Sequence, residues 1–187
     1  MAQQQNEMAS STGMTADSGG RVWHLDALAT SVTFDTKAMW LFKVHGTIPA
    51  LEGSAVVGEG AQGAEGRLVL DATRIDTGTA KRDAHLQTAD FFDTENHPTV
   101  VFVATSAAPM GGQVDQGTVE IQGKLTIADK TRPLTIRAEV RRDGDVAIVT
   151  STFTLDRRDW GLTWAKMGAG VVNNVRVEAR FTRDTSR

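Results

Sequence analysis

Three long segments of the chain alternate apolar and polar residues with a strict period of two. Residues 118–127 show this most clearly, with Val119 and Ile121 on one face and polar side chains on the other. Residues 133–142 and 171–181 repeat the pattern. Successive side chains of a strand point to opposite faces, whereas a helix would need apolar spacings of three and four. The pattern therefore predicts long strands with one face in a core and the other in water.

Further segments rich in β-branched and apolar residues predict additional strands at 31–37, 40–46, 53–58, 67–75, 99–105 and 146–155. Gly111-Gly112 and Asp143-Gly144 are typical hairpin signals, and residues 128–132 form a short connection. The total is about eight strands, the number that closes a barrel around side chains or one small ligand. We predict an all-β, eight-stranded antiparallel barrel.

Residues 79–92 interrupt the strand pattern with a composition typical of a helix. Thr79 is a candidate N-cap, and Ala84, Leu86 and Ala89 would form a partial apolar face. We therefore expect a short helical insert between strands of the barrel.

Residues 1–20 contain no Ile, Leu, Val or aromatic residue and are predicted to be a disordered leader. Residues 21–184 are predicted to form the barrel domain. The leader shows no signal-peptide pattern, and no apolar run is long enough for a transmembrane helix, so we expect a cytoplasmic protein without a membrane span.

The composition excludes several kinds of function. The chain has no cysteine, which excludes disulfides, thiolate zinc sites and a cysteine nucleophile. The formal net charge of -3 provides no basic field for nucleic acid. The four histidines lack the spacing of a metal site. We expect neither metal nor cofactor, and no catalytic motif is visible.

Four segments, in order along the chain, together resemble the YceI-like family of lipocalin-like proteins. They are Val32-Thr33-Phe34; Ile75-Asp76-Thr77-Gly78 with Lys81-Arg82-Asp83-Ala84-His85-Leu86, Ala89-Asp90-Phe91-Phe92-Asp93 and His97-Pro98-Thr99; Gly123-Lys124-Leu125-Thr126-Ile127 with Arg132-Pro133-Leu134; and Leu155-Asp156-Arg157-Arg158-Asp159-Trp160-Gly161-Leu162. The resemblance implies a lipocalin-like barrel around an elongated apolar cavity. It also implies a polyisoprenoid, a quinone-like lipid or another long amphiphile as ligand. The sequence departs from the family at residues 40–52, where we expect a reshaped mouth.

Candidate ligand-binding residues are the large apolar side chains, together with two polar donors in the helical insert. They are Trp40, Phe42, Arg82, His85, Phe91, Phe92, Phe102, Leu125, Phe153, Trp160 and Trp164. Arg82 and His85 could hydrogen-bond a polar head group. In the alternative interpretation, Arg82 and Asp83 tie the insert to a neighbouring strand.

The aromatic rings could line a cavity for an isoprenoid chain or simply fill a core. Phe91 and Phe92 are adjacent, so they could not both point inward from a strand. Residues 158–170, which carry Trp160 and Trp164, form a candidate lid. The charged run 156–159 is interpreted as a solvated strand end with local ion pairs.

Three functions remain open. The favoured one is binding or carriage of a long apolar amphiphile. The second is a small isomerase or cyclase acting in the same cavity, for which Asp83, His85 or Asp90 would supply the acid or base. The third is a barrel with a filled interior that serves as an interaction module. The oligomeric state is open, a homodimer included. Small inward residues would leave room for a ligand. The candidates are Ala72, Ala104, Gly123, Ala138 and Ala179.

Overall fold

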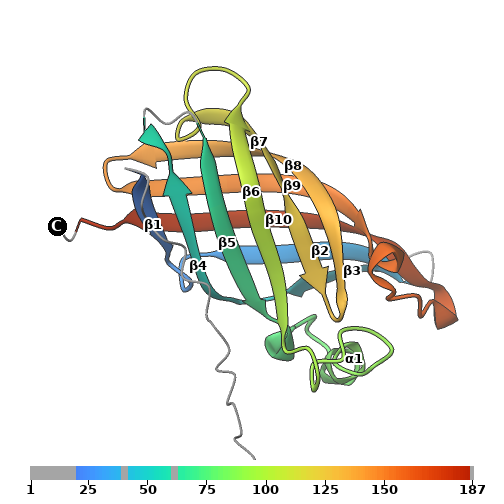
Figure 1. Cartoon of the computed structure of the whole chain (residues 1–187). Helices are drawn as coiled ribbons and strands as arrows, with labels where there is room; N and C mark the ends of the chain where they lie inside the picture. Colours follow the sequence, from blue (N-terminus) through green and yellow to red (C-terminus); the bar gives the residue numbers. More distant parts are fainter. Residues whose placement is uncertain (1–19, 39–41, 60–62, 186–187) are drawn as a thin grey trace, which may run out of the picture.

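The structure is a computed structural model that describes residues 20–38, 42–59 and 63–185, with only the backbone described at Ala38 and Met167. Its ten strands form one antiparallel sheet that closes into a barrel (Figure 1). The strands are β1 Arg21–Leu25, β2 Ser31–Ala38, β3 Phe42–Thr47, β4 Ala50–Val57, β5 Ala64–Asp71, β6 Thr99–Pro109, β7 Gly117–Ile127, β8 Lys130–Asp143, β9 Val146–Asp156 and β10 Ala169–Arg183.

The ten strands occupy eight positions around the barrel wall, because two positions are each built from two consecutive strands. β1 and β2 both pair with β10: β1 pairs with the C-terminal end of β10, and β2 pairs with the preceding part of β10. β3 pairs with β2, and β4 pairs with β1 and β5. The pairing of β1 with both β4 and β10 closes the ring, which confirms the predicted eight-stranded antiparallel barrel with a short helix.

Each of these two positions is interrupted by a short bend between its two strands. Residues 26–30 separate β1 from β2, and Ile48 and Pro49 separate β3 from β4. At the first bend the Arg180 amide donates to the Thr30 Oγ1 atom at 3.1 Å instead of to a strand carbonyl. Proline has no N–H to donate to a ladder, so Pro49 suits the second bend.

Several strand boundaries differ from those predicted. The short β1 was missed, β5 ends at Asp71 rather than residue 75, and β8 begins at Lys130 rather than 133. The end of β5 has a local cause: the Asp71 Oδ1 atom accepts from the Thr73 amide at 3.0 Å and caps a 3₁₀ turn, Ala72–Arg74. Pairing of Ile127 with Lys130 leaves only two residues for the β7–β8 turn.

The two predicted hairpin turns, Gly111-Gly112 and Asp143-Gly144, behave differently. Asp143 pairs with Val146, and Gly144 in the two-residue turn between them has φ +57°, a conformation that favours glycine. Gly111 and Gly112 instead belong to a longer loop between β6 and β7. Of the two predicted hairpin turns, only the one at Asp143-Gly144 is therefore a tight two-residue turn.

The predicted insert contains helix α1, Ala80–Leu86, followed by turns through Phe92. Thr79 is its N-cap residue, but its side chain makes no capping hydrogen bond. α1 and residues 157–168 lie at one end of the barrel, which we call the helix end (Figure 1). β1 and the β8–β9 hairpin lie at the opposite end, the far end. Across the part of the chain described, no helix is long and apolar enough to cross a membrane.

The interior follows the alternation predicted from the sequence. Along β7, Val119, Leu125 and Ile127 are buried, whereas Gln122 and Lys124 are exposed. The buried apolar residues separate into two clusters. One cluster at the helix end contains Phe91, Leu155 and Trp160, and the other at the far end contains Trp23, Val119 and Val140. A cavity lies between and beside these two clusters.

Candidate ligand-binding cavity

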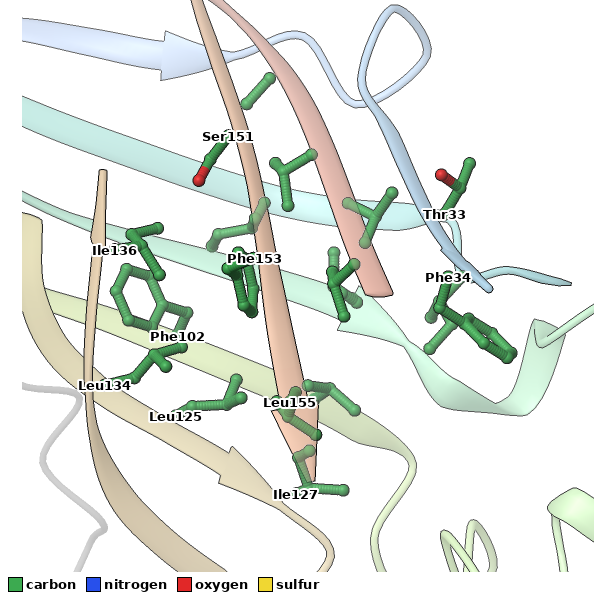
Figure 2. Close-up of a pocket in the computed structure, with 18 of the residues that line it drawn as sticks. Thr33, Phe34, Phe102, Leu125, Ile127, Leu134, Ile136, Ser151, Phe153 and Leu155 are labelled. Carbon is green, nitrogen blue, oxygen red and sulfur yellow. The ribbon is translucent and has the colours of Figure 1, made fainter. Parts of the chain in front are cut away.

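The barrel encloses a cavity of about 600 Å³ that extends from the helix end to the far end. Arg82 and Trp164 line it at the helix end, and Trp23 and Asp115 line it at the far end. This volume lies within the range of about 300–1,000 Å³ that is typical of small-molecule sites. Most of the wall is aliphatic or aromatic, as the middle of the barrel shows (Figure 2).

The inward positions of the alternating strands build this wall. On β9, Ser151, Phe153 and Leu155 face the cavity at intervals of two, and Leu134 and Ile136 do the same on β8 (Figure 2). Ser151 is the polar member of the β9 row, and its hydroxyl is already used: Oγ donates to the Arg137 carbonyl at 2.7 Å.

The small inward residues have two different roles. Ala104 and Ala179 line the cavity and leave it open. Gly123 does not line it: a Cβ atom at Gly123 would collide first with the Val103 carbonyl oxygen and would also approach the Phe102 Cζ atom to 2.7 Å. Ala72 and Ala138 are buried without lining the cavity. Glycine at 123 therefore positions a ring of the wall.

Arg157 organises the segment that covers the helix end. Its side chain is 6% exposed and donates to three main-chain carbonyls: Gly170 from Nε at 3.0 Å, Trp164 from Nη2 at 2.5 Å, and Leu162 from Nη1. The guanidinium carbon lies 5.1 Å from the centre of the Phe91 ring, a cation–π geometry. Burial lowers the pKa of Arg157 from its ordinary value.

The burial of Arg157 corrects the interpretation of residues 156–159 as a solvated run. That interpretation holds for Asp156 and Arg158, which pair with each other. It fails for Arg157, because the polypeptide turns back over this side chain and supplies three carbonyl acceptors. Residues 158–170 thus form a covering segment that is fixed from beneath by a buried cation.

Arg82 and Asp83 both hold Thr77, the residue that leads into α1. The Arg82 Nε atom donates to the Thr77 Oγ1 atom at 2.6 Å, and Nη2 donates to the Thr77 carbonyl at 2.8 Å. Asp83 accepts from the Thr77 amide at 2.9 Å and from its hydroxyl. As in the alternative interpretation, the pair holds the insert in place, but it bonds to the segment just before α1 and not to a neighbouring strand. Arg82 nevertheless also lines the cavity.

His85 lies among aromatic rings at the helix end. Its ring centre is 4.7 Å from that of Trp164 and 5.2 Å from that of Phe91, and both contacts are edge-on. Its Nε2 atom lies 2.9 Å from the Asp90 Oδ2 atom. Phe91 and Phe92 both line the cavity, which is allowed because they lie in turns rather than on a strand.

Charged residues line both ends of the cavity. Lys37, Arg82, Arg157 and Lys166 line the helix end, whereas Glu65, Arg67 and Asp115 line the part toward the far end. Asp115 is buried, accepts from the Arg142 Nη1 atom, and lies 3.5 Å from the Arg21 Nη2 atom. These two arginines do not line the cavity. The cavity wall itself is therefore basic at the helix end and of mixed charge toward the far end, where the buried charge is the Asp115 carboxylate.

Eight of the predicted ligand-binding residues line the cavity: Arg82, His85, Phe91, Phe92, Phe102, Leu125, Phe153 and Trp164. Trp160 does not; it is buried behind the wall, where its Nε1 atom donates to the Leu125 carbonyl at 2.9 Å. Phe42 is 62% exposed on β3 and lies outside the cavity. Trp40 lies outside the described residues.

Sequence reasoning missed two kinds of cavity residue. Val149, Ser151 and Leu155 share the face of Phe153, so the period of β9 could have identified them. Trp23 and Asp115 gave no such signal, because β1 is only five residues long and Asp115 lies in a loop. Within the described ranges, no group of His, Asp or Glu residues is arranged to hold a metal ion.

The closed antiparallel barrel, the short helix at one end and the elongated apolar interior define a lipocalin-like protein. A model of the YceI-like domain matches residues 23–182, and the chain belongs to this family. Protein YceI of Escherichia coli O157:H7 is 33% identical over 107 residues, which are 57% of this chain and 52% of that protein. The chain thus aligns with about half the length of that curated relative.

Two solved structures share the fold. Burkholderia cenocepacia BcnA superposes with a TM-score of 0.72 over 83% of this chain and 98% of its own, at 17% identity. A polyisoprenoid-binding domain from Saccharophagus degradans, implicated in plant cell wall breakdown, gives a TM-score of 0.67 over 87% of this chain and 98% of its own, at 13% identity. At these identities the likeness concerns the fold alone.

Proposed function

We propose that this protein binds one long apolar amphiphile, of the polyisoprenoid or fatty-lipid class, with its chain inside the barrel and its polar head at the helix end. The observation that carries the proposal is the apolar cavity of about 600 Å³ running from one end of the barrel to the other. A structural neighbour described as a polyisoprenoid-binding domain supports the same class of ligand.

The chemistry of the wall suits a hydrocarbon chain. Each methylene that leaves water for an apolar site contributes about 0.8 kcal/mol. A chain of a dozen or more carbons therefore gains enough gross free energy to offset the loss of translational and conformational freedom on binding. Phe102, Phe153 and Leu125 supply the contact surface in the middle of the barrel.

The helix end suits the head group. Lys37 and Lys166 line the cavity there and are exposed, so this end of the cavity meets solvent. The hydrogen bonds of Arg82 use Nε and Nη2, and among the described residues no partner is found for Nη1. A phosphate or hydroxyl head could accept from these groups.

The chain-binding part is tested by blocking the cavity. Ala179 lines the cavity from β10, and its neighbour Glu178 points outward and is exposed. Ala179→Phe should lower the affinity of delipidated protein for geranylgeraniol at least about 10-fold, because the new ring occupies the volume the chain needs. Glu178→Phe should bind as the unmodified protein does. Native mass spectrometry and a fluorescence titration measure both, and equal affinities would contradict the proposal.

The head position is tested by comparing two probes on one variant. Arg82→Ala should weaken binding of geranylgeranyl phosphate more than binding of geranylgeraniol, because only the phosphate uses the guanidinium fully. Arg74→Ala is the matched control, since Arg74 is exposed near the same end and does not line the cavity. An equal loss for both probes would place the head elsewhere. The isomerase or cyclase alternative has no observation in its favour.

A further inference from the structure

The far end of the cavity contains an indole donor without an acceptor. Trp23 lines the cavity and is 2% exposed. Its Nε1 atom is the one buried side-chain nitrogen or oxygen, among those of the described residues, that has no hydrogen-bond partner. An indole N–H can only donate, and buried donors in folded proteins are nearly always paired. Such an exception within a binding cavity points to a partner supplied from outside the chain.

The other buried indole is paired. The Trp160 Nε1 atom donates to the Leu125 carbonyl at 2.9 Å, and Trp160 does not line the cavity. Within the described part of the chain, the fold therefore provides a main-chain acceptor for the tryptophan behind the wall and none for the tryptophan on the wall.

The charges at the far end limit what the partner can be. Among the described residues that line this end, Asp115 carries the buried charge, and its carboxylate disfavours an anion, whereas Glu65 and Arg67 also line the wall but are exposed. Asp115 is already engaged by Arg21 and Arg142. The remaining wall near Trp23 is formed by aliphatic residues such as Val57, Val119 and Val140. An uncharged oxygen satisfies the indole without placing a second charge in this apolar site.

We propose that Trp23 donates a hydrogen bond to an uncharged ether, carbonyl or hydroxyl oxygen at the inner end of the bound molecule. The inference rests on the proposed function and deepens it, because it names a second polar position on the ligand. The natural ligand class is then a long amphiphile that carries oxygen at its buried end as well as at its head. Trp23 acts as a specificity-determining residue that selects such molecules over simple hydrocarbon chains.

The test compares two probe series that differ by one atom. The first series is the 1-alkanols from dodecanol to eicosanol, and the second is their analogues in which one methylene near the far terminus is replaced by an ether oxygen. The oxygen adds an acceptor with little change in shape. The measured quantity is the ratio of the affinity for the ether to the affinity for the alkanol of the same length. For the chain lengths that reach Trp23, this ratio should be about 3- to 10-fold higher in the unmodified protein than in Trp23→Phe.

Trp160→Phe is the matched control, and it should keep the preference of the unmodified protein. A second readout is the indole ¹⁵N–¹H resonance of Trp23, identified by its loss in Trp23→Phe. This resonance should move when the ether binds and stay nearly in place when the alkanol binds. The spectrum also reports whether the variant is folded.

The outcomes separate this inference from the proposed function. Equal ether preference in the unmodified protein and in Trp23→Phe at every chain length, with an unmoved Trp23 resonance, would overturn the inference alone; a buried water satisfying the indole would give this result. Failure of both probe series to bind would overturn the inference together with the proposed function.

Discussion

Trp160 at the helix end and Trp23 at the far end are both almost fully buried, 4% and 2% exposed, yet their indole nitrogens differ. Trp160 Nε1 is bonded to a main-chain carbonyl, whereas Trp23 Nε1 has no acceptor among the described residues. The same contrast extends to the surroundings. At the helix end, Arg157 donates to three carbonyl groups of the covering segment. The buried donors of Trp160 and Arg157 at the helix end are bonded within the chain, whereas the Trp23 donor at the far end has no acceptor among the described residues.

This difference teaches how to separate structural from functional polar groups inside a barrel. A buried polar atom that the protein itself satisfies contributes to stability, and its removal is costly. A buried polar atom on a cavity wall without a partner carries a desolvation cost that binding can recover. Stability measurements on the free protein should therefore respond to changes at the helix end and hardly at all to loss of the Trp23 N–H.

The largest effect is expected from a charge placed in the far-end core. Val119 is 1% exposed, so Val119→Asp would bury a carboxylate without a partner and should cost about 4 kcal/mol or more, enough to unfold the barrel. Gln122→Asp lies on the outer face of the same strand and should change stability by no more than about 0.5 kcal/mol. Circular dichroism and urea denaturation measure both. Similar losses at the two positions would contradict the alternation of β7.

The next effect concerns the covering segment. Arg157→Met removes three hydrogen bonds to carbonyls and should destabilise the protein by about 2–4 kcal/mol, with faster hydrogen exchange in residues 158–170. Arg157→Lys should recover little of this, since an ammonium cannot reproduce the planar fork. The neighbouring change Arg158→Met is the control and should cost less than about 1 kcal/mol. If the two arginines proved equivalent, Arg157 would not fix the covering segment.

The two tryptophans provide the sharpest comparison. Trp160→Phe removes the bond to the Leu125 carbonyl and should cost about 1–2 kcal/mol beyond the loss from the smaller ring. Trp23→Phe removes a donor that has no partner in the described chain, so its cost should be limited to the smaller ring. Urea denaturation of both variants without ligand gives the difference. Equal costs would mean that Trp23 Nε1 is satisfied in the free protein.

The smallest effect is electrostatic. The hydrogen bond from the Arg158 side chain lowers the pKa of Asp156 from its ordinary value of 3.8 to about 2. Because the folded pKa is the lower one, this carboxylate stabilises the fold fully above pH 3.8, and its contribution disappears as the pH falls through about 2. The stability difference between Asp156→Asn and the unmodified protein should therefore shrink over that interval, as measured by urea denaturation at each pH. A constant difference would show that Asp156 acts through its shape and not its charge.

Local pattern was sufficient to predict most of the barrel wall. Alternation in β7, β8 and β10 identified the inward residues correctly, because the period of two is a property of the strand backbone itself. The same pattern would have identified Ser151 had it been applied throughout β9. The ends were less predictable, since the 3₁₀ turn after Asp71 depends on one side-chain cap and β1 on its pairing with β4 and β10.

The sequence by itself determined the class of fold, the inward faces of the strands and eight of the residues that line the cavity. Only the tertiary structure decided which polar groups are paired. Arg157 and Arg158 are neighbouring arginines in the chain, yet Arg157 is buried beneath the carbonyls of Leu162, Trp164 and Gly170, and Arg158 is exposed beside Asp156. Trp23 and Trp160 are both buried, yet among the described residues only the Trp160 indole nitrogen has a carbonyl within hydrogen-bond distance. Hydrogen-bond partners distant in sequence are set by how strands and loops meet in space, and a local pattern carries no information about that meeting.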